Sequence, residues 1–167
     1  KSEYAWDDVT VKVFDVKVDK NIEIGIVKSY DNTLEAAAGE LGLKYKQLDA
    51  KDLESDLSRY KTIVIDIRAY LVREDLKKNN QRLLEYVRNG GNLVVMYQKD
   101  QDWKSEYAPY PIQVTRKRVS VEEAPVKILH PEHPLFNAPN KITAEDWVGW
   151  IQERGVYYPD GVASEYT

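Results

Sequence analysis

Polar and aromatic side chains follow the strands that the sequence predicts, at the edge where a parallel sheet presents residues to a ligand. In open α/β sheets, ligands bind beyond the carboxyl ends of the strands. Arginine, carboxylate, amide and phenol groups at that edge are suited to clamp an anion or the hydroxyls of a sugar. The candidate ligand-binding residues are Tyr30, Asp31, Arg68, Tyr70, Gln98, Gln152, Glu153 and Arg154.

Arg68 is the most constrained of these candidates because it directly follows the nearly continuous apolar segment 62–67. A cation at the end of a buried strand needs a partner, since an unpaired buried charge is costly. We expect that partner to be Glu153, or Asp31 across the sheet. Two interpretations stay open: an internal brace between arginine and carboxylate, or a clamp for an anion or a sugar hydroxyl.

The sequence offers no obvious nucleophile or metal ligand set. The chain contains no cysteine, and Ser29 lies outside a Gly-x-Ser-x-Gly elbow. His130 and His133 are three residues apart, but Pro131 and Pro134 exclude the regular helix that would make this spacing a zinc pair. A glycine-rich phosphate loop between strand and helix is also missing. We therefore nominate no catalytic residue, no metal site and no cofactor.

Trp147 and Trp150 are three residues apart on a short predicted helix that begins at Thr143. This spacing places both rings near one face of the helix. Core packing is one interpretation. The other is a platform on which a sugar ring stacks, with Tyr157 and Tyr158 nearby in the sequence.

The elements that must position these residues alternate between strand and helix in the first half of the chain. Four segments predict strands: residues 22–27, 62–67 and 93–97, and a short one at residues 45–48. Apolar residues at helical spacing predict one helix between Asn32 and Gly42, and a second over residues 74–89. This alternation predicts an α/β fold with a parallel sheet and helices on both faces, of flavodoxin-like or class I glutamine-amidotransferase-like topology.

The regions that flank this pattern are less regular. Valines alternate with polar residues in the first part of segment 9–18, which predicts an amphipathic strand. That strand is either an edge strand of this domain or the tail of a preceding β-domain, so residues 1–21 form a leading strand or linker. The second half is rich in proline and loops, with short strands expected near residues 112–118, 126–129 and 156–158.

Composition excludes several classes of protein. The 167 residues suffice for one domain with its own core, and the start of the alternating strand–helix pattern assigns that domain to residues 22–167. The net charge of −4 comes from interspersed acidic and basic residues, so no nucleic-acid partner is expected. No apolar run reaches the roughly 18 residues that cross a bilayer, so no membrane partner is expected either.

Three stretches together resemble one protein family. They are residues 67–70 with 79–87, residues 90–98, and the motifs between residues 133 and 155. These motifs resemble the glutamine-amidotransferase-like domain that lies C-terminal to the deacetylase domain in bacterial PIG-L (LmbE-like) proteins. The likeness runs from about residue 22 to residue 159, which is most of the chain.

The resemblance implies an accessory domain without chemistry of its own. Its partner would be the zinc-dependent deacetylase domain of the same polypeptide, whose His-Pro-Asp-Asp metal motif has no counterpart here. The family pattern continues past Thr167 with a further strand and helix, so we expect a domain that is truncated at its C-terminus. The family resemblance also favours a periplasmic or extracellular location.

Three functions fit the sequence, and each makes a different structural prediction. A carbohydrate-binding accessory module predicts an open cleft lined by Tyr30, Arg68, Tyr70, Gln98 and residues 152–154. An interdomain scaffold or oligomerisation module predicts that internal partners engage Arg68 and that an apolar patch is exposed. A hydrolase predicts a carboxylate or histidine within hydrogen-bond reach of a second titratable group, inside a pocket.

Overall fold

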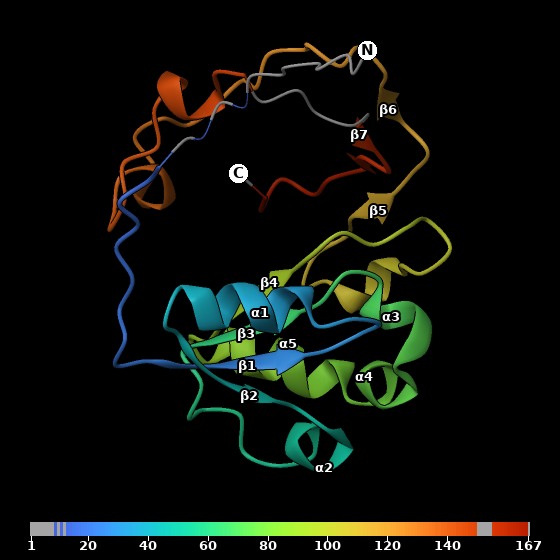
Figure 1. Ribbon diagram of the computed structural model, residues 1–167. Helices are drawn as coiled ribbons and strands as arrows, with labels where there is room; N and C mark the ends of the chain where they lie inside the picture. The colour runs from blue at the N-terminus through green and yellow to red at the C-terminus, as the bar shows by residue number, and fades with distance from the viewer. Residues whose placement is uncertain (1–8, 10, 12, 150–154, 167) are drawn as a thin grey trace, which may run out of the picture.

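A four-stranded parallel sheet in the order β2-β1-β3-β4 forms the centre of the molecule (Figure 1). The computed structural model describes residues 9, 11, 13–149 and 155–166. The strands are β1 (Glu23–Val27), β2 (Lys44–Gln47), β3 (Thr62–Ile65) and β4 (Asn92–Val95). The α/β class is confirmed, and the strand order is compatible with a flavodoxin-like fold.

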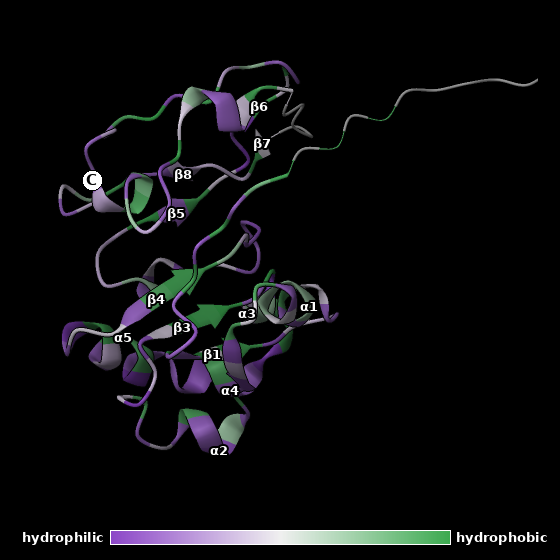
Figure 2. Ribbon diagram, turned by 60° about the vertical axis from the view of Figure 1, so that its left-hand side comes forward, coloured by the Kyte–Doolittle hydropathy of each residue, from purple (hydrophilic) through white to green (hydrophobic). Residues whose placement is uncertain are grey.

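Helices cover both faces of this sheet, as the alternating pattern predicts. They are α1 (Thr33–Glu40), α2 (Ala50–Leu53), α3 (Ala69–Val72), α4 (Glu74–Lys78) and α5 (Asn80–Arg88). On one face, Ala38 of α1 packs with Ile24 and Ile26. On the other face, Leu83 of α5 joins Ile63 in the larger core cluster. Figure 2 shows hydrophobic residues concentrated in the strands between these layers.

The helix expected over residues 74–89 is divided into α4 and α5 at Asn79. This residue leaves helical geometry, with φ −96° and ψ 9°. Its side-chain Nδ2 donates to the backbone oxygen of Asp75 at 3.0 Å. An asparagine side chain that bonds to nearby backbone competes with regular helix in this way. The break still leaves Leu76 and Leu83 buried, so the predicted apolar face is retained.

The second half contains short elements with little regular structure between them. They are the 3-10 helices η1 (Ser105–Tyr107), η2 (Pro134–Phe136) and η3 (Ala144–Trp147), and the strands β5 (Gln113–Val114), β6 (Arg118–Val119), β7 (Gly155–Val156) and β8 (Pro159–Asp160). β5 pairs with β8, and β6 pairs with β7, both antiparallel.

Several expectations for this half are corrected by the structure. The strand expected over residues 112–118 is two separate two-residue strands, β5 and β6. Residues 126–129 form no strand. The strand expected over 156–158 ends at Val156, because Tyr157 adopts a left-handed φ of 63°. The helix predicted after Thr143 is confirmed as η3, with Thr143 and Asp146 forming its capping box.

Of the segment 9–18, the described residues 9, 11 and 13–18 form no strand, which corrects the expected amphipathic strand there, and residues 10 and 12 lie outside the described residues. The reason is that no neighbouring strand in the described part of the chain pairs with it. Its valines remain exposed, with Val13 at 91%. One contact fixes its end: Lys17 N donates to Asn140 Oδ1 at 2.7 Å, and Asn140 Nδ2 donates to Lys17 O at 2.8 Å.

Candidate functional site

The loops that follow β1, β3 and β4 meet at the carboxyl edge of the sheet, and Arg68 lies where they join. Arg68 precedes α3 and adopts a left-handed conformation, with φ 55°. Its backbone N–H donates to the oxygen of Tyr97 at 2.9 Å, which ties the loop after β3 to the loop after β4. A non-glycine residue in this conformation is uncommon and needs such surrounding contacts to hold it.

Asp102 is the partner of Arg68, which corrects the expectation of Asp31 or Glu153. Arg68 Nε lies 2.7 Å from Asp102 Oδ2, and Nη2 lies 3.1 Å from Oδ1, so the pair is bidentate. Asp31 instead accepts from the backbone N–H of Thr33 at 2.9 Å. Glu153 lies outside the described residues. The brace between arginine and carboxylate is therefore present, with a partner that the sequence analysis did not name.

Electrostatics favour the charged form of Asp102 despite its burial. Burial by itself raises the pKa of this carboxyl, but the hydrogen bonds from Arg68 and from the Lys99 backbone outweigh it, so the pKa is lowered overall. The same hydrogen bond raises the pKa of Arg68. Because Asp102 is only 4% exposed, removing Arg68 would leave a buried carboxylate without its partner, which costs more than breaking a surface ion pair.

Asp66 organises the neighbouring loop from inside. Its Oδ2 accepts from the backbone N–H of Ser29 at 3.0 Å and from the Ser29 hydroxyl at 2.8 Å. Its Oδ1 accepts from the N–H of Ile67 at 2.8 Å. The Ser29 hydroxyl is thus a donor to a carboxylate that fixes two loops, which is a structural arrangement for that serine.

Arg73 joins three further segments. Its guanidinium donates to the backbone oxygens of Lys28 at 3.0 Å and Leu48 at 2.9 Å. It also forms an ion pair with Asp75, in which Nη2 lies 2.6 Å from Oδ2. The hydrogen bond from Arg73, opposed by burial, lowers the pKa of Asp75. The loops after β1 and β2 therefore share one anchor at the start of α4.

Tyr70 and Gln98 lie in the interior, which corrects their assignment to the lining of an open cleft. Tyr70 is fully buried, and its hydroxyl donates to Asn80 Oδ1 at 2.6 Å. Burial raises the pKa of this phenol. Gln98 Nε2 donates to the backbone oxygens of Asp66 at 3.0 Å and Met96 at 2.9 Å. Both side chains therefore form hydrogen bonds within the protein interior.

An aromatic cluster holds the start of the second half against the sheet domain. The ring of Tyr70 stacks on Tyr107 with a centroid distance of 4.3 Å and an interplanar angle of 7°. Trp103 meets Tyr70 edge-on at 5.6 Å, and its Nε1 donates to the oxygen of Ile112 at 3.0 Å. These contacts place the loop after β4 beside the start of α5, where Asn80 Nδ2 donates to the oxygen of Glu106 at 3.4 Å.

The surface that remains at this edge is aromatic and apolar around a fixed cation. We call it the strand-end surface, and it consists of Tyr30, Ile67, Arg68 and Tyr97. The exposed fractions are 58% for Tyr30, 43% for Ile67 and 41% for Tyr97. The guanidinium of Arg68 is close enough to interact electrostatically with both tyrosines. Tyrosine and arginine around an apolar residue are the composition of interface hot spots.

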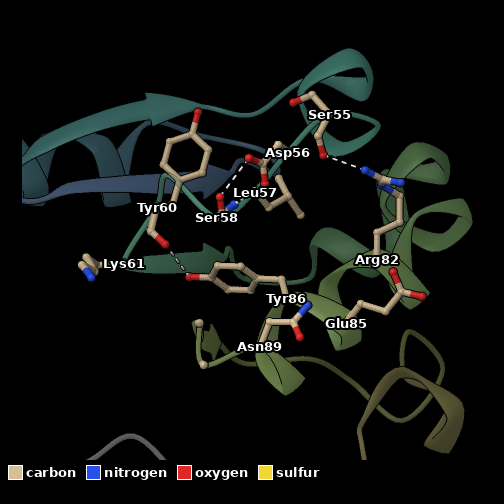
Figure 3. A pocket seen from close by; sticks show the side chains of 12 residues that line it. Ser55, Asp56, Leu57, Ser58, Tyr60, Lys61, Arg82, Glu85, Tyr86 and Asn89 are labelled. Carbon is tan, nitrogen blue, oxygen red and sulfur yellow. Dashed lines mark hydrogen bonds between the residues drawn. The ribbon is translucent and has the colours of Figure 1, made fainter.

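A pocket that the sequence analysis missed lies at the opposite, amino-terminal edge of the sheet (Figure 3). Its volume is about 270 Å³, and it lies between the loop before β3 and the end of α5. Arg82 is held there by the backbone oxygens of Leu53 at 2.9 Å and Ser55 at 2.7 Å. Tyr86 forms part of its lining and donates its hydroxyl to the oxygen of Tyr60 at 3.0 Å.

Gly91, between the end of α5 and β4, helps to shape this pocket. A Cβ at Gly91 would lie 2.2 Å from the ring of Tyr86, so the backbone rests directly on the aromatic face. The Gly-Gly pair before β4 is the sequence signal that could have pointed to this close approach.

Of the two tryptophans of the expected sugar-stacking platform, the structure describes Trp147 but not Trp150. Trp147 lines an apolar pocket of about 470 Å³ together with Leu129, Leu135 and Phe136. Trp150, Gln152, Glu153 and Arg154 lie outside the described residues. His130 Nδ1 lies 3.5 Å from Glu132, and His133 Nδ1 accepts from the N–H of Leu135.

The structure thus brings Tyr30 and Arg68 together at one edge and leaves Asp31 beside them in a turn. None of the helices within the described residues combines the length and apolar character needed to cross a bilayer. Comparisons with protein-family models, with curated proteins and with solved structures found no match to this chain.

Proposed function

We propose that this chain is a non-catalytic accessory α/β domain of class I glutamine-amidotransferase-like type, which packs against a neighbouring domain of the same polypeptide. The resemblance to PIG-L-associated domains makes a deacetylase-type domain the expected neighbour. In this role the domain acts as an interdomain scaffold, and the strand-end surface is its contact area.

The observation that carries this proposal is the way polar groups at the carboxyl edge are used. Arg68 is bound by Asp102, Ser29 by Asp66, and the Gln98 amide by backbone groups. A binding module or hydrolase would direct such groups toward a ligand, whereas here they hold the loops to one another. A rigid edge with exposed tyrosine and isoleucine around a fixed arginine suits a protein contact.

The complete gene product allows a direct test with matched variants. Ile67→Lys places a charge in the strand-end surface, whereas Leu41→Lys changes a similarly exposed residue, 40% against 43%, at the end of α1. By calorimetry we expect the wild type and Leu41→Lys to unfold with coupled domain transitions. Ile67→Lys should separate the transitions, because a desolvated lysine opposes docking.

Measurements on the 167-residue chain itself provide the control. Both substitutions are on the surface, so each should change its stability by no more than about 0.5 kcal/mol. A gene product without a second domain, or one whose domains unfold independently in the wild type, would contradict the proposal. Saturable heat on titration with chito-oligosaccharides, lost in Tyr30→Ala, would establish carbohydrate binding in its place.

A further inference from the structure

The pocket at the amino-terminal edge of the sheet combines an apolar floor with a charged rim (Figure 3). Leu57 and the ring of Tyr86 form the floor, and these residues are only 5% and 6% exposed. The Tyr86 hydroxyl is held between the backbone oxygens of Tyr60 at 3.0 Å and Asn92 at 3.2 Å. Because the hydroxyl is engaged there, the ring offers the pocket an apolar surface.

Arg82 is fixed in the rim of the pocket while part of its guanidinium stays unused. Nε donates to the backbone oxygen of Leu53 at 2.9 Å, and Nη2 donates to that of Ser55 at 2.7 Å. Within the described residues, Nη1 has no hydrogen-bond partner. A guanidinium that is already held in position presents its remaining N–H groups in the geometry that suits a carboxylate.

Glu85 lies at the same end of the pocket as Arg82, and both come from α5 (Figure 3). Residues at this spacing are neighbours on a helix surface. The Glu85 carboxylate forms no hydrogen bond or ion pair within the described part of the chain. Asp56 differs, because its oxygens accept from the N–H and the hydroxyl of Ser58, both at 2.9 Å. The carboxylate that is available beside Arg82 is therefore that of Glu85.

The charges in the rim balance, because Arg82 and Lys61 are matched by Asp56 and Glu85. A simple anion is attracted by Arg82 but repelled by Glu85, and a simple cation meets the reverse. A molecule with a carboxylate and an ammonium group on one carbon satisfies both side chains together. The pocket volume of about 270 Å³ lies just below the roughly 300–1,000 Å³ of pockets for drug-sized ligands, so a smaller molecule suits it.

We propose that this pocket binds a free aliphatic α-amino acid. The carboxylate of the ligand binds Arg82, and its ammonium group binds Glu85. Its aliphatic side chain packs on Leu57 and Tyr86, where burial of apolar surface adds to the affinity. This inference does not depend on docking to a neighbouring domain, because the pocket and the strand-end surface lie at opposite edges of the sheet.

Titration calorimetry of the 167-residue chain with three related molecules tests the two charged contacts separately. L-leucine carries both charged groups, 4-methylpentanoate lacks the ammonium group, and 3-methylbutylamine lacks the carboxylate. We expect saturable heat with L-leucine. Each analogue should bind at least about tenfold more weakly, because it loses one charge-assisted contact and leaves an opposed charge beside it.

Glu85→Gln tests the assignment of the ammonium group without disturbing an internal contact. It should weaken L-leucine binding by about tenfold or more and remove the advantage of L-leucine over 4-methylpentanoate. Glu40→Gln, which changes an exposed glutamate at the end of α1 outside the pocket, is the matched control and should bind L-leucine as the wild type does.

Arg82→Lys keeps the positive charge but loses the fork, so it should weaken the binding of L-leucine. Circular dichroism and the thermal midpoint follow its fold, because Arg82 also holds the loop at Leu53 and Ser55. If this variant does not fold, Glu85→Gln still decides the question.

Three results would overturn the inference. One is L-leucine that gives no saturable heat up to its solubility limit. The second is either analogue binding as tightly as L-leucine, which would show that the pocket does not recognise both charges. The third is an equal loss of L-leucine binding in Glu85→Gln and Glu40→Gln, which would place the site elsewhere.

Discussion

At the scale of single residues, buried ion pairs at the carboxyl edge determine how the loops are held. Arg68 and Asp102 are separated by β4 in the sequence, yet they form a bidentate pair in which the carboxylate is almost fully buried. The sequence showed that Arg68 needs a carboxylate, because it follows an apolar strand. It could not show which one, since several acidic residues lie in the loops at that edge.

Asp102→Asn should lower the free energy of unfolding by about 2–3 kcal/mol at neutral pH, because it leaves the Arg68 cation without its counter-charge. Arg116→Gln is the matched control. It removes an ion pair of the same 2.7 Å distance to Asp100, but Arg116 is 72% exposed, so its effect should be small. Chemical denaturation of the three proteins checks both expectations.

The lowered pKa of Asp102 also predicts a pH dependence. Its pKa is lower in the folded protein than in the unfolded chain, so the folded state favours the charged form. The stabilisation is complete above the unfolded value of about 4 and is lost as the pH falls through the folded value. Below pH 4 the stability of Asp102→Asn should therefore fall less steeply than that of the wild type. Parallel slopes would contradict this account.

At the scale of elements, the sequence patterns predicted which helices pack on the sheet. They did not predict at which residues the helices and strands end. Apolar runs predicted β1, β3 and β4, as expected for strands of a covered parallel sheet, whereas the edge strand β2 has the polar sequence Lys-Tyr-Lys-Gln and was predicted from its place in the strand–helix alternation. The break between α4 and α5 was missed because it depends on a side-chain hydrogen bond of Asn79, which leaves no mark on apolar periodicity. The expected N-terminal strand was wrong for another reason: the valines alternate as in a strand, but no strand among the described residues pairs with this segment.

Tyr70→Phe tests how α3 is joined to α5. The substitution removes the hydroxyl that donates to Asn80 Oδ1 and leaves that buried oxygen without its partner. We expect a loss of about 1–3 kcal/mol of stability while the ring stacking on Tyr107 is retained. Tyr30→Phe changes an exposed hydroxyl and should be nearly neutral. If thermal unfolding gives equal midpoints for both variants, the hydroxyl does not couple the helices.

At the scale of the whole molecule, the core is confined to the first two-thirds of the chain. Among the described residues, every buried one lies between Ile24 and Tyr107. The second half follows as two-residue strands and 3-10 helices, and such short elements have no periodicity that a sequence pattern can reveal. This explains why the sequence predicted the sheet domain well and the arrangement of residues 108–166 poorly.

Limited trypsin digestion should distinguish the sheet domain, which has a core, from residues 108–166, which contain no buried residue among those described. We expect early cleavage at Arg116, Lys117 or Arg118, which are exposed and lie beyond the last buried residue. A fragment that contains β1 to η1 should persist, because the aromatic cluster of Tyr70, Trp103 and Tyr107 closes its end. Opening free energies are lowest where few apolar contacts are buried. Early cleavage inside α5 would contradict this order.

The shared anchor at Arg73 limits how this fold can be re-engineered. The guanidinium of Arg73 donates hydrogen bonds to the carbonyl oxygens of Lys28 and Leu48, which lie in two different loops, the ones after β1 and after β2. A designer who grafts a foreign sequence into either connection must therefore preserve the position of its carbonyl, or the other connection loses alignment as well. Transplants that replace both connections together with residues 73–75 have the better prospect of retaining the architecture.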